Sequence, residues 1–146
     1  MQFARVIPFA ALFFTVAAHA IDFKSVGDSP AVLYDAPSLR GIKKFVAPRQ
    51  MPLEVVLTYG EWSKVRDVSG DLLWLESKAL NSKRMVVANV ANLKVRAAAE
   101  DGAAAVFSAD KGVLLELSAP AAAGWVKVRH RDGQSGYAKA TEVWGE

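Results

Sequence analysis

The sequence predicts an all-β protein in which two small β-barrels follow one another after an N-terminal signal helix. Three observations support this prediction. The first residues have the pattern of an export signal, the rest of the chain contains an internal repeat, and the elements within each copy are short and alternate between apolar and polar residues. Each copy leaves no segment for a helical layer, so it has to bury its core by closing a sheet on itself.

Residues 1–20 have the three parts of a secretory signal peptide. Arg5 gives a basic start, residues 6–16 are almost wholly apolar, and an Ala-His-Ala sequence ending at Ala20 supplies the cleavage pattern. A membrane-spanning helix needs about twenty apolar residues, whereas this stretch contains Pro8. We therefore expect cleavage after Ala20 and a periplasmic or secreted product without a stable membrane span. Retention of the segment as an uncleaved anchor is the alternative.

The composition excludes several classes of site and partner. The chain has no cysteine, which removes disulfides, a thiolate nucleophile and thiolate metal ligands together. Cleavage would remove Arg5 and no acid, so the formal net charge would fall from +3 to +2. So small a charge does not indicate a nucleic-acid partner. We expect no cofactor, and the oligomeric state stays open.

The mature chain contains two copies of one unit. Seven positions match across an offset of 63 residues without a gap. Elsewhere the copies differ slightly in loop length, which costs little free energy. The matched pairs are Trp62 with Trp125, Val65 with Val128, Arg66 with Arg129, Gly70 with Gly133, Trp74 with Tyr137, Leu75 with Ala138, and Leu80 with Val143.

The best-marked element of each copy is a β-hairpin. In the second copy a strand over residues 125–131 turns through an Asp-Gly pair into a strand over residues 135–139. In the first copy a strand over residues 62–68 turns through a Ser-Gly pair into a strand over residues 72–76. Asp-Gly between alternating strands is a strong hairpin signal.

We expect the first barrel to span residues 28–90 and the second to span residues 91–146. The segment 83–88 is mostly apolar and lacks glycine and proline, so it is predicted to be a strand that completes the first barrel rather than a flexible linker. A barrel of about sixty residues buries little surface by itself. The two barrels are therefore expected to pack on one another.

Several motifs resemble those of bacterial SH3-like domains. The first copy has Gly-Glu-Trp-Ser-Lys-Val-Arg over residues 60–66, and the second has GWVKVRHRDGQSGYAKATEVWG over residues 124–145, which is the closer likeness. The sequence LESKALNSKRMVV over residues 75–87 resembles the bridge between tandem copies of the family. The likeness covers about residues 30–145. It implies a tandem, exported, non-catalytic protein of the bacterial envelope, in a family of which some members bind peptidoglycan or peptides.

The sequence departs from the family pattern in two places. Leu73 stands where a glycine usually precedes the second aromatic residue, and the second copy opens with Arg96 followed by three alanines instead of an Arg-x-Gly-Pro turn. Both departures concern turns and the surroundings of the aromatic residues. They affect the expected shape of the groove more than the expected fold.

Alternation along the strands places an aromatic pair on the outer face of each barrel, Trp62 with Trp74 and Trp125 with Tyr137. Rings with one apolar body and one polar edge suit sugars and extended peptides. Tyr59 is close to Trp62 in sequence and is expected to flank it. In the alternative interpretation, at least one of the two pairs seals a barrel end or forms the contact between the copies.

A basic segment precedes these aromatic residues. Arg40, Lys43, Lys44 and Arg49 lie in a stretch, residues 36–53, that contains no acid. Such a cluster can attract an anionic partner. Local charge runs are common, and a solvated loop is the simpler interpretation.

Nothing in the sequence indicates an active site. After cleavage the one remaining histidine is His130, between Arg129 and Arg131, and these cations repel a metal ion and disfavour the imidazolium. The sequence contains no glycine-rich phosphate loop, metal signature or nucleophile elbow. We expect a protein that is not an enzyme and binds no metal. A wall hydrolase is the weakest function class, because the two copies account for nearly all of the mature chain.

The function expected is that of an exported binding or adaptor module of the bacterial envelope. Its surface aromatic residues would recognise peptidoglycan, another cell-wall glycan or peptide, or a second envelope protein. Two alternatives stay open: a structural protein-protein interaction module with no small ligand, and an accessory subunit of a cell-wall enzyme.

Overall fold

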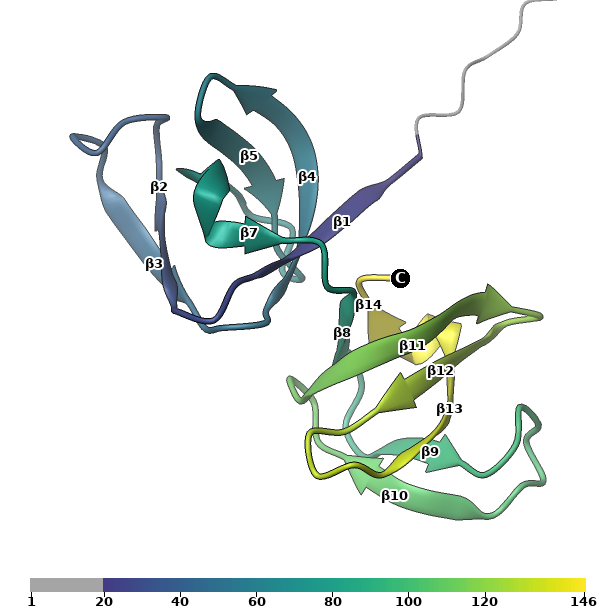
Figure 1. Cartoon of the computed structure of the whole chain (residues 1–146). Coiled ribbons are helices and arrows are strands. Elements are labelled where there is room, and N and C mark those ends of the chain that lie inside the picture. Colours follow the sequence, from purple (N-terminus) through teal and green to yellow (C-terminus); the bar gives the residue numbers. More distant parts are fainter. Residues whose placement is uncertain (1–19) are drawn as a thin grey trace, which may run out of the picture.

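The computed structural model describes residues 20–146, which form two antiparallel β-sheets and contain no α-helix (Figure 1). This confirms the all-β prediction. The predicted signal segment, residues 1–20, lies outside the described residues except for Ala20. No helix within residues 20–146 is long and apolar enough to cross a membrane.

The first sheet has seven strands and one 3₁₀ turn. These elements are β1 (Asp22–Val26), β2 (Ala31–Tyr34), β3 (Lys43–Ala47), β4 (Pro52–Tyr59), β5 (Trp62–Arg66), β6 (Leu72–Glu76), the 3₁₀ turn η1 (Ser77–Ala79) and β7 (Leu80–Asn81).

The second sheet also has seven strands and one 3₁₀ turn. These elements are β8 (Met85–Ala88), β9 (Leu93–Arg96), β10 (Ala105–Ala109), β11 (Leu114–Ala122), β12 (Trp125–Arg129), β13 (Ser135–Lys139), the 3₁₀ turn η2 (Ala140–Glu142) and β14 (Val143–Trp144).

Both sheets have the same strand order. The first runs β3-β2-β6-β5-β4-β1-β7 and the second β10-β9-β13-β12-β11-β8-β14, so each strand of one sheet has a counterpart seven places later in the other. The predicted hairpins are present as β5–β6 and β12–β13. Gly70 and Gly133 have φ values of 93° and 96°, a conformation that glycine adopts without steric cost.

One sequence-based assignment was wrong. The segment 83–88 was expected to complete the first barrel, but β8 pairs with β11 and β14 of the second sheet. The corresponding strand of the first sheet is β1, which lies before residue 28 and pairs with β4 and β7. Each unit therefore begins one strand earlier than the matched motifs indicate, and only residues 82–84 separate the two sheets.

Each sheet has its own hydrophobic core, built from the inward positions of alternating strands. The first core contains Val26, Ala31, Leu33, Ala47, Leu53, Val65 and Leu75. The second contains Val86, Ala88, Leu93, Val95, Ala109, Leu115, Val126, Val128, Ala138 and Val143.

The two sheets contact each other at a small seam. The Phe23 and Trp144 rings meet edge to face with their centroids 5.0 Å apart. The guanidinium of Arg84 lies 5.7 Å from the Phe23 centroid, and its Nη2 donates to the main-chain oxygen of Gly145 at 2.9 Å. A Cβ on Gly145 would lie 3.0 Å from Pro52 of the first sheet. Glycine thus allows the end of the second sheet to approach the first.

Candidate binding site

The first candidate binding face lies on the outer side of β2, β5 and β6. Tyr34 and Lys64 both pair with Trp74, so the three side chains form one row across the sheet. Trp62 lies beside this row, and its ring meets that of Tyr34 at 84° with centroids 5.5 Å apart. The Nζ of Lys64 lies 5.8 Å from the Trp74 ring centroid. We call Tyr34, Trp62, Lys64 and Trp74 the first aromatic face.

The fold holds the first aromatic face in place from beneath. Tyr34 is only 7% exposed, whereas Trp62 and Trp74 are half-buried. Ser63, between two outward residues of β5, points inward, and its hydroxyl lies 2.7 Å from that of Ser77 in η1. The strand carrying Trp62 is thereby tied to the turn that follows β6. Ordered rings with one free side lose little conformational entropy when a ligand binds.

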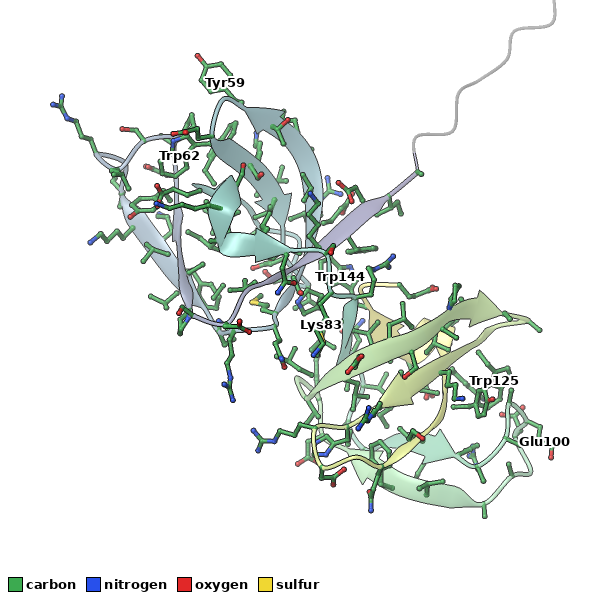
Figure 2. The ribbon with its side chains drawn as sticks, viewed as in Figure 1. Tyr59, Trp62, Lys83, Glu100, Trp125 and Trp144 are labelled. Carbon is green, nitrogen blue, oxygen red and sulfur yellow. The ribbon has the colours of Figure 1, made fainter. Side chains whose placement is uncertain are left out.

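Tyr59 is placed differently from the expectation that it flanks Trp62. The two residues face each other across the β4–β5 hairpin, but Tyr59 is 68% exposed. Figure 2 shows its ring projecting beyond the end of the hairpin, away from Trp62. The ring that packs against Trp62 is that of Tyr34.

The second candidate binding face occupies the equivalent strands of the second sheet. Tyr137 pairs with Arg96 on β9 and with Lys127 on β12, and Trp125 pairs with Lys139. Both rings are half-buried. We call Arg96, Trp125, Lys127, Tyr137 and Lys139 the second aromatic face. It carries three cations where the first aromatic face carries one.

The loop between β9 and β10 is fixed to the second aromatic face by polar contacts. The Nζ of Lys139 lies 2.8 Å from Oδ1 of Asp101, and Nη1 of Arg96 donates to the main-chain oxygen of Ala103 at 2.9 Å. The hydrogen bond from Lys139 lowers the pKa of Asp101 and correspondingly raises that of Lys139. Figure 2 shows Glu100 of this loop and Trp125 at the same end of the sheet.

The predicted basic residues do not join either aromatic face. Lys43 and Lys44 open β3, which is the outer edge of the first sheet. Arg40 lies in the loop before β3, and Arg49 lies in the turn after it. All four side chains are exposed. Lys44 also lines a pocket of about 510 Å³ whose walls include Phe45, Met51, Val68, Leu72 and Leu73.

The aromatic residues predicted for binding do not form the contact between the sheets. Figure 2 shows Trp62 and Trp125 at opposite ends of the molecule, with Trp144 between them near the seam. The alternative interpretation, in which the Trp62 or Trp125 pair joins the two copies, is therefore wrong. The sequence analysis did not identify Phe23 and Trp144 as the pair at the seam. One signal was available: Trp144 directly follows the matched residue Val143, so strand alternation places its side chain on the outer side.

Five further members of the aromatic faces were also missed: Tyr34, Lys64, Arg96, Lys127 and Lys139. Tyr34 directly follows the core residue Leu33, and Arg96 follows Val95, so the period of two along a strand predicts an outward position for both. Lys64 lies between the inward Ser63 and Val65, so the same period of two places it on the outer side.

His130 is placed at the β12–β13 turn. Its Nδ1 lies 3.1 Å from Oδ2 of Asp132, and its ring centroid lies 5.9 Å from that of Phe107. The main-chain N–H of Gln134 is the main cause of the lowered pKa of Asp132, and His130 adds to it. Within residues 20–146, no three acidic or histidine side chains gather where they could hold a metal ion.

The sequence and fold were compared with known proteins. No curated protein matches the sequence of this chain. The solved structures that this chain resembles at low similarity include NlpC1 and NlpC2 from Trichomonas vaginalis, each 9% identical with a TM-score of 0.41. The matches cover 90% and 89% of this chain but only 48% and 50% of the respective NlpC chains. The chain thus spans about half the length of these structures.

A family comparison assigns the second unit. Residues 89–145 match the family model described as bacterial SH3 domain. This range contains β9 to β14, including the Trp125–Arg129 strand and the Gly133 turn on which the sequence resemblance rests. The second half of the chain therefore carries a bacterial SH3-like domain.

Proposed function

We propose that the chain is a tandem pair of bacterial SH3-like barrels, the first built from β1 to β7 (residues 22–81) and the second from β8 to β14 (residues 85–144). The identical strand order of the two sheets supports this proposal. So does the equivalence of their hairpins, in which Trp62 and Trp125 each open the strand before a glycine turn. The family match covers the second unit alone.

The function that the site supports best is that of an exported, non-catalytic module that binds cell-wall glycan or peptide. The observation that carries it is the group of packed rings on the first aromatic face, in which the half-buried Trp62 lies against the buried Tyr34 and the half-buried Trp74 lies beside Lys64. Flat aromatic surfaces bind the apolar faces of sugars and the side chains of extended peptides.

The second aromatic face supports a complementary role for the second unit. Arg96 and Lys127 flank Tyr137, whereas Lys139, opposite Trp125, is paired with Asp101. Cations beside rings favour ligands that carry carboxylates. Wall peptides and envelope proteins both present carboxylates. The export of the protein to the periplasm or beyond follows in this proposal from the signal pattern in residues 1–20.

Co-sedimentation with purified sacculi tests the proposed function. Replacing Trp62 and Trp125 together by alanine removes one ring from each face, and stacking contacts between aromatic rings contribute about 0.5–1.5 kcal/mol each. We expect the apparent affinity to fall by about tenfold. Trp62→Phe keeps a ring and should retain most of the binding.

A matched control is available on the same sheet. Val56 is 42% exposed on β4, outside both aromatic faces, so Val56→Ala should leave co-sedimentation unchanged. Equal binding by the wild-type protein and the Trp62→Ala, Trp125→Ala variant would reject the proposal. Far-UV circular dichroism of each variant separates a lost fold from a lost contact.

A further inference from the structure

The loop between β2 and β3, together with β3 itself, exposes large apolar side chains. Leu39 and Ile42 in the loop are 65% and 64% exposed, and Phe45 and Val46 on β3 are 45% and 59% exposed. Four exposed apolar side chains within eight residues are unusual for a surface segment that only contacts water. We call residues 39–46 the amphiphilic edge.

Cations are interleaved with these apolar residues. Arg40, Lys43 and Lys44 lie within the amphiphilic edge, and Arg49 follows it; all four are exposed. None of the four forms an ion pair with an acid in the part of the chain that the structure describes. The nearest acid in sequence, Asp35, accepts a hydrogen bond from the main-chain N–H of Ile42 at 2.8 Å. The edge therefore presents positive charge together with apolar surface.

The fold does not require these side chains. The loop of the second sheet closes with the same main-chain hydrogen bonds: Asp35 N–H donates to Ile42 O, as Ala97 N–H donates to Ala104 O. At these equivalent positions, 62 residues later, the second loop carries Asp101 in place of Leu39. Other positions of that loop are mostly alanine. Small residues are thus sufficient for the turn, and the apolar and basic side chains of the amphiphilic edge need another explanation.

We propose that the amphiphilic edge docks the protein on the surface of an anionic phospholipid bilayer. Leu39 and Ile42 enter the boundary between headgroups and acyl chains, while Arg40, Lys43 and Lys44 contact lipid phosphates. Apolar side chains combined with cations are the pattern of interfacial membrane binding, in which burial and electrostatic attraction act together. The bilayer contact is independent of the aromatic faces, which lie on other strands.

The shape of the edge favours a bilayer over a protein partner. Leu39 and Ile42 stand on a loop and do not line the pocket of about 510 Å³ beside β3, whose walls include Phe45. A peptide ligand would use the pocket and would gain little from the two loop residues. A lipid surface accepts protruding side chains without a complementary groove.

Vesicle co-sedimentation of the full chain tests the electrostatic half of the proposal. We expect binding to phosphatidylcholine vesicles containing about 30% phosphatidylglycerol to exceed binding to pure phosphatidylcholine, and about 0.5 M NaCl to reduce the excess. Replacing Lys43 and Lys44 by glutamate should weaken binding to the anionic vesicles by about 25-fold or more, because each cation near such a surface contributes about fivefold. Residues 1–20 are the same in every variant, so the difference belongs to the edge.

A variant with the same change in net charge provides the control. Lys94 and Lys111 are exposed on the second unit, and replacing both by glutamate should weaken vesicle binding by no more than about twofold, since charges beyond a Debye length of the surface are screened. An equal loss in both charge variants would mean that the attraction depends on net charge alone, and it would overturn the proposal.

Replacing Leu39 and Ile42 by serine tests the apolar half. We expect vesicle binding to weaken by about tenfold, because the variant no longer buries this apolar area in the headgroup region, while its net charge is unchanged. The control replaces Val56 and Val106, which are 42% and 43% exposed elsewhere, by serine, and it should bind like the wild-type protein. Loop variants that bind vesicles normally but no longer bind sacculi would assign the edge to the wall and overturn the proposal. Loss of vesicle binding with normal sacculus binding supports it independently of the aromatic faces.

Discussion

The outer face of the first sheet brings together three rings and one cation, whereas the same positions of the second sheet hold two rings and three cations. The inward positions of both sheets are aliphatic and nearly interchangeable. The backbone depends on the inward residues, so the outward residues are free to differ. One architecture thus presents two surfaces of different charge. Tyr34 corresponds to Arg96, Trp62 to Trp125, Lys64 to Lys127, Trp74 to Tyr137 and Glu76 to Lys139.

A second difference lies beneath these faces, at the residue before Trp74 or Tyr137. In the second sheet this is Gly136, where an added Cβ would lie 2.5 Å from the main-chain oxygen of Arg96. In the first sheet it is Leu73, a half-buried residue that lines the pocket of about 510 Å³. The departure from the family's glycine therefore coincides with a pocket that the Leu73 side chain helps to line.

The largest predicted effect is that of Gly136→Ala. The new Cβ has to displace backbone rather than a flexible side chain, and overpacking of this kind costs about 2–3 kcal/mol. We expect the urea unfolding midpoint, measured by tryptophan fluorescence and far-UV circular dichroism, to fall accordingly. The matched variant Leu73→Ala withdraws part of one side chain and should cost about 1 kcal/mol.

Equal losses in the Gly136→Ala and Leu73→Ala variants would contradict the expectation that position 136 is more tightly packed than position 73. A small loss of stability in Gly136→Ala would mean that β9 can move away from β13 at little cost in free energy. The two sheets would then tolerate a side chain at this position about equally, despite the short distance from the added Cβ to the Arg96 oxygen.

The two sheets also differ where each one ends. Asn81 on β7 accepts a hydrogen bond from the main-chain N–H of Lys83 at 3.1 Å and lies 2.7 Å from the Ser25 hydroxyl. The counterpart of Asn81 on β14 is Trp144, which contacts Phe23 of the first sheet. Asn81 at the end of β7 thus fixes the chain where it leaves the first sheet, whereas Trp144 at the end of β14 forms part of the seam between the sheets.

A double-mutant cycle on Phe23 and Trp144 should measure this seam. Edge-to-face aromatic pairs contribute about 1 kcal/mol beyond their buried area. We therefore expect the double variant to lose less free energy of unfolding than the sum of the losses in Phe23→Ala and Trp144→Ala. The difference should be about the energy of the aromatic pair. Additive losses in urea unfolding would show that the two rings act separately and that the sheets are held by other contacts.

The sequence predicted those features that local periodicity and turn chemistry determine. The hairpins at Gly70 and Gly133 agree with the structure, and the period of two along the strands accounts for the buried positions of Val65 and Val128. The outward placement of the aromatic pairs follows from the same period of two. Because these features depend on neighbouring residues, one sequence without relatives was sufficient to predict them.

The features that the sequence did not predict depend on which strands pair over long distances. β8 has an apolar pattern that suits either sheet, and its pairing with β11 and β14 places it in the second. The contact between Tyr34 and Trp62, and that between Phe23 and Trp144, joins residues far apart in sequence. Alternation shows which side a residue faces, but it does not identify its neighbour on that side.

The smallest predicted effect concerns the two loops that border the aromatic faces. In the second sheet, Asp101 of the loop forms an ion pair with Lys139. The equivalent positions of the first sheet hold Leu39 and Glu76, and Oε1 of Glu76 lies 3.4 Å from Nζ of Lys78. The loop of the second sheet is therefore tethered by an ion pair that the first lacks. Both partners are exposed, so the stabilisation is small and sensitive to salt.

The pH dependence of Asp101→Asn should identify this tether. The pKa of Asp101 is lowered from its ordinary value of 3.8, so its contribution is fully present above that value and is lost as the pH falls through the lower folded-state pKa. The pKa of Lys139 is raised from 10.5, so its contribution is present below that value and is lost as the pH rises through the higher folded-state pKa. Between these two limits the urea unfolding midpoint of the wild-type protein should therefore be higher than that of Asp101→Asn by a small, constant amount. This difference in midpoint should vanish at both extremes of pH.

The control is Leu39→Asn. Because Leu39 has no such partner, this substitution should change the urea unfolding midpoint by an amount that does not depend on pH. A margin for Asp101→Asn that is likewise independent of pH would mean that the carboxylate stabilises the loop by its shape rather than by its charge.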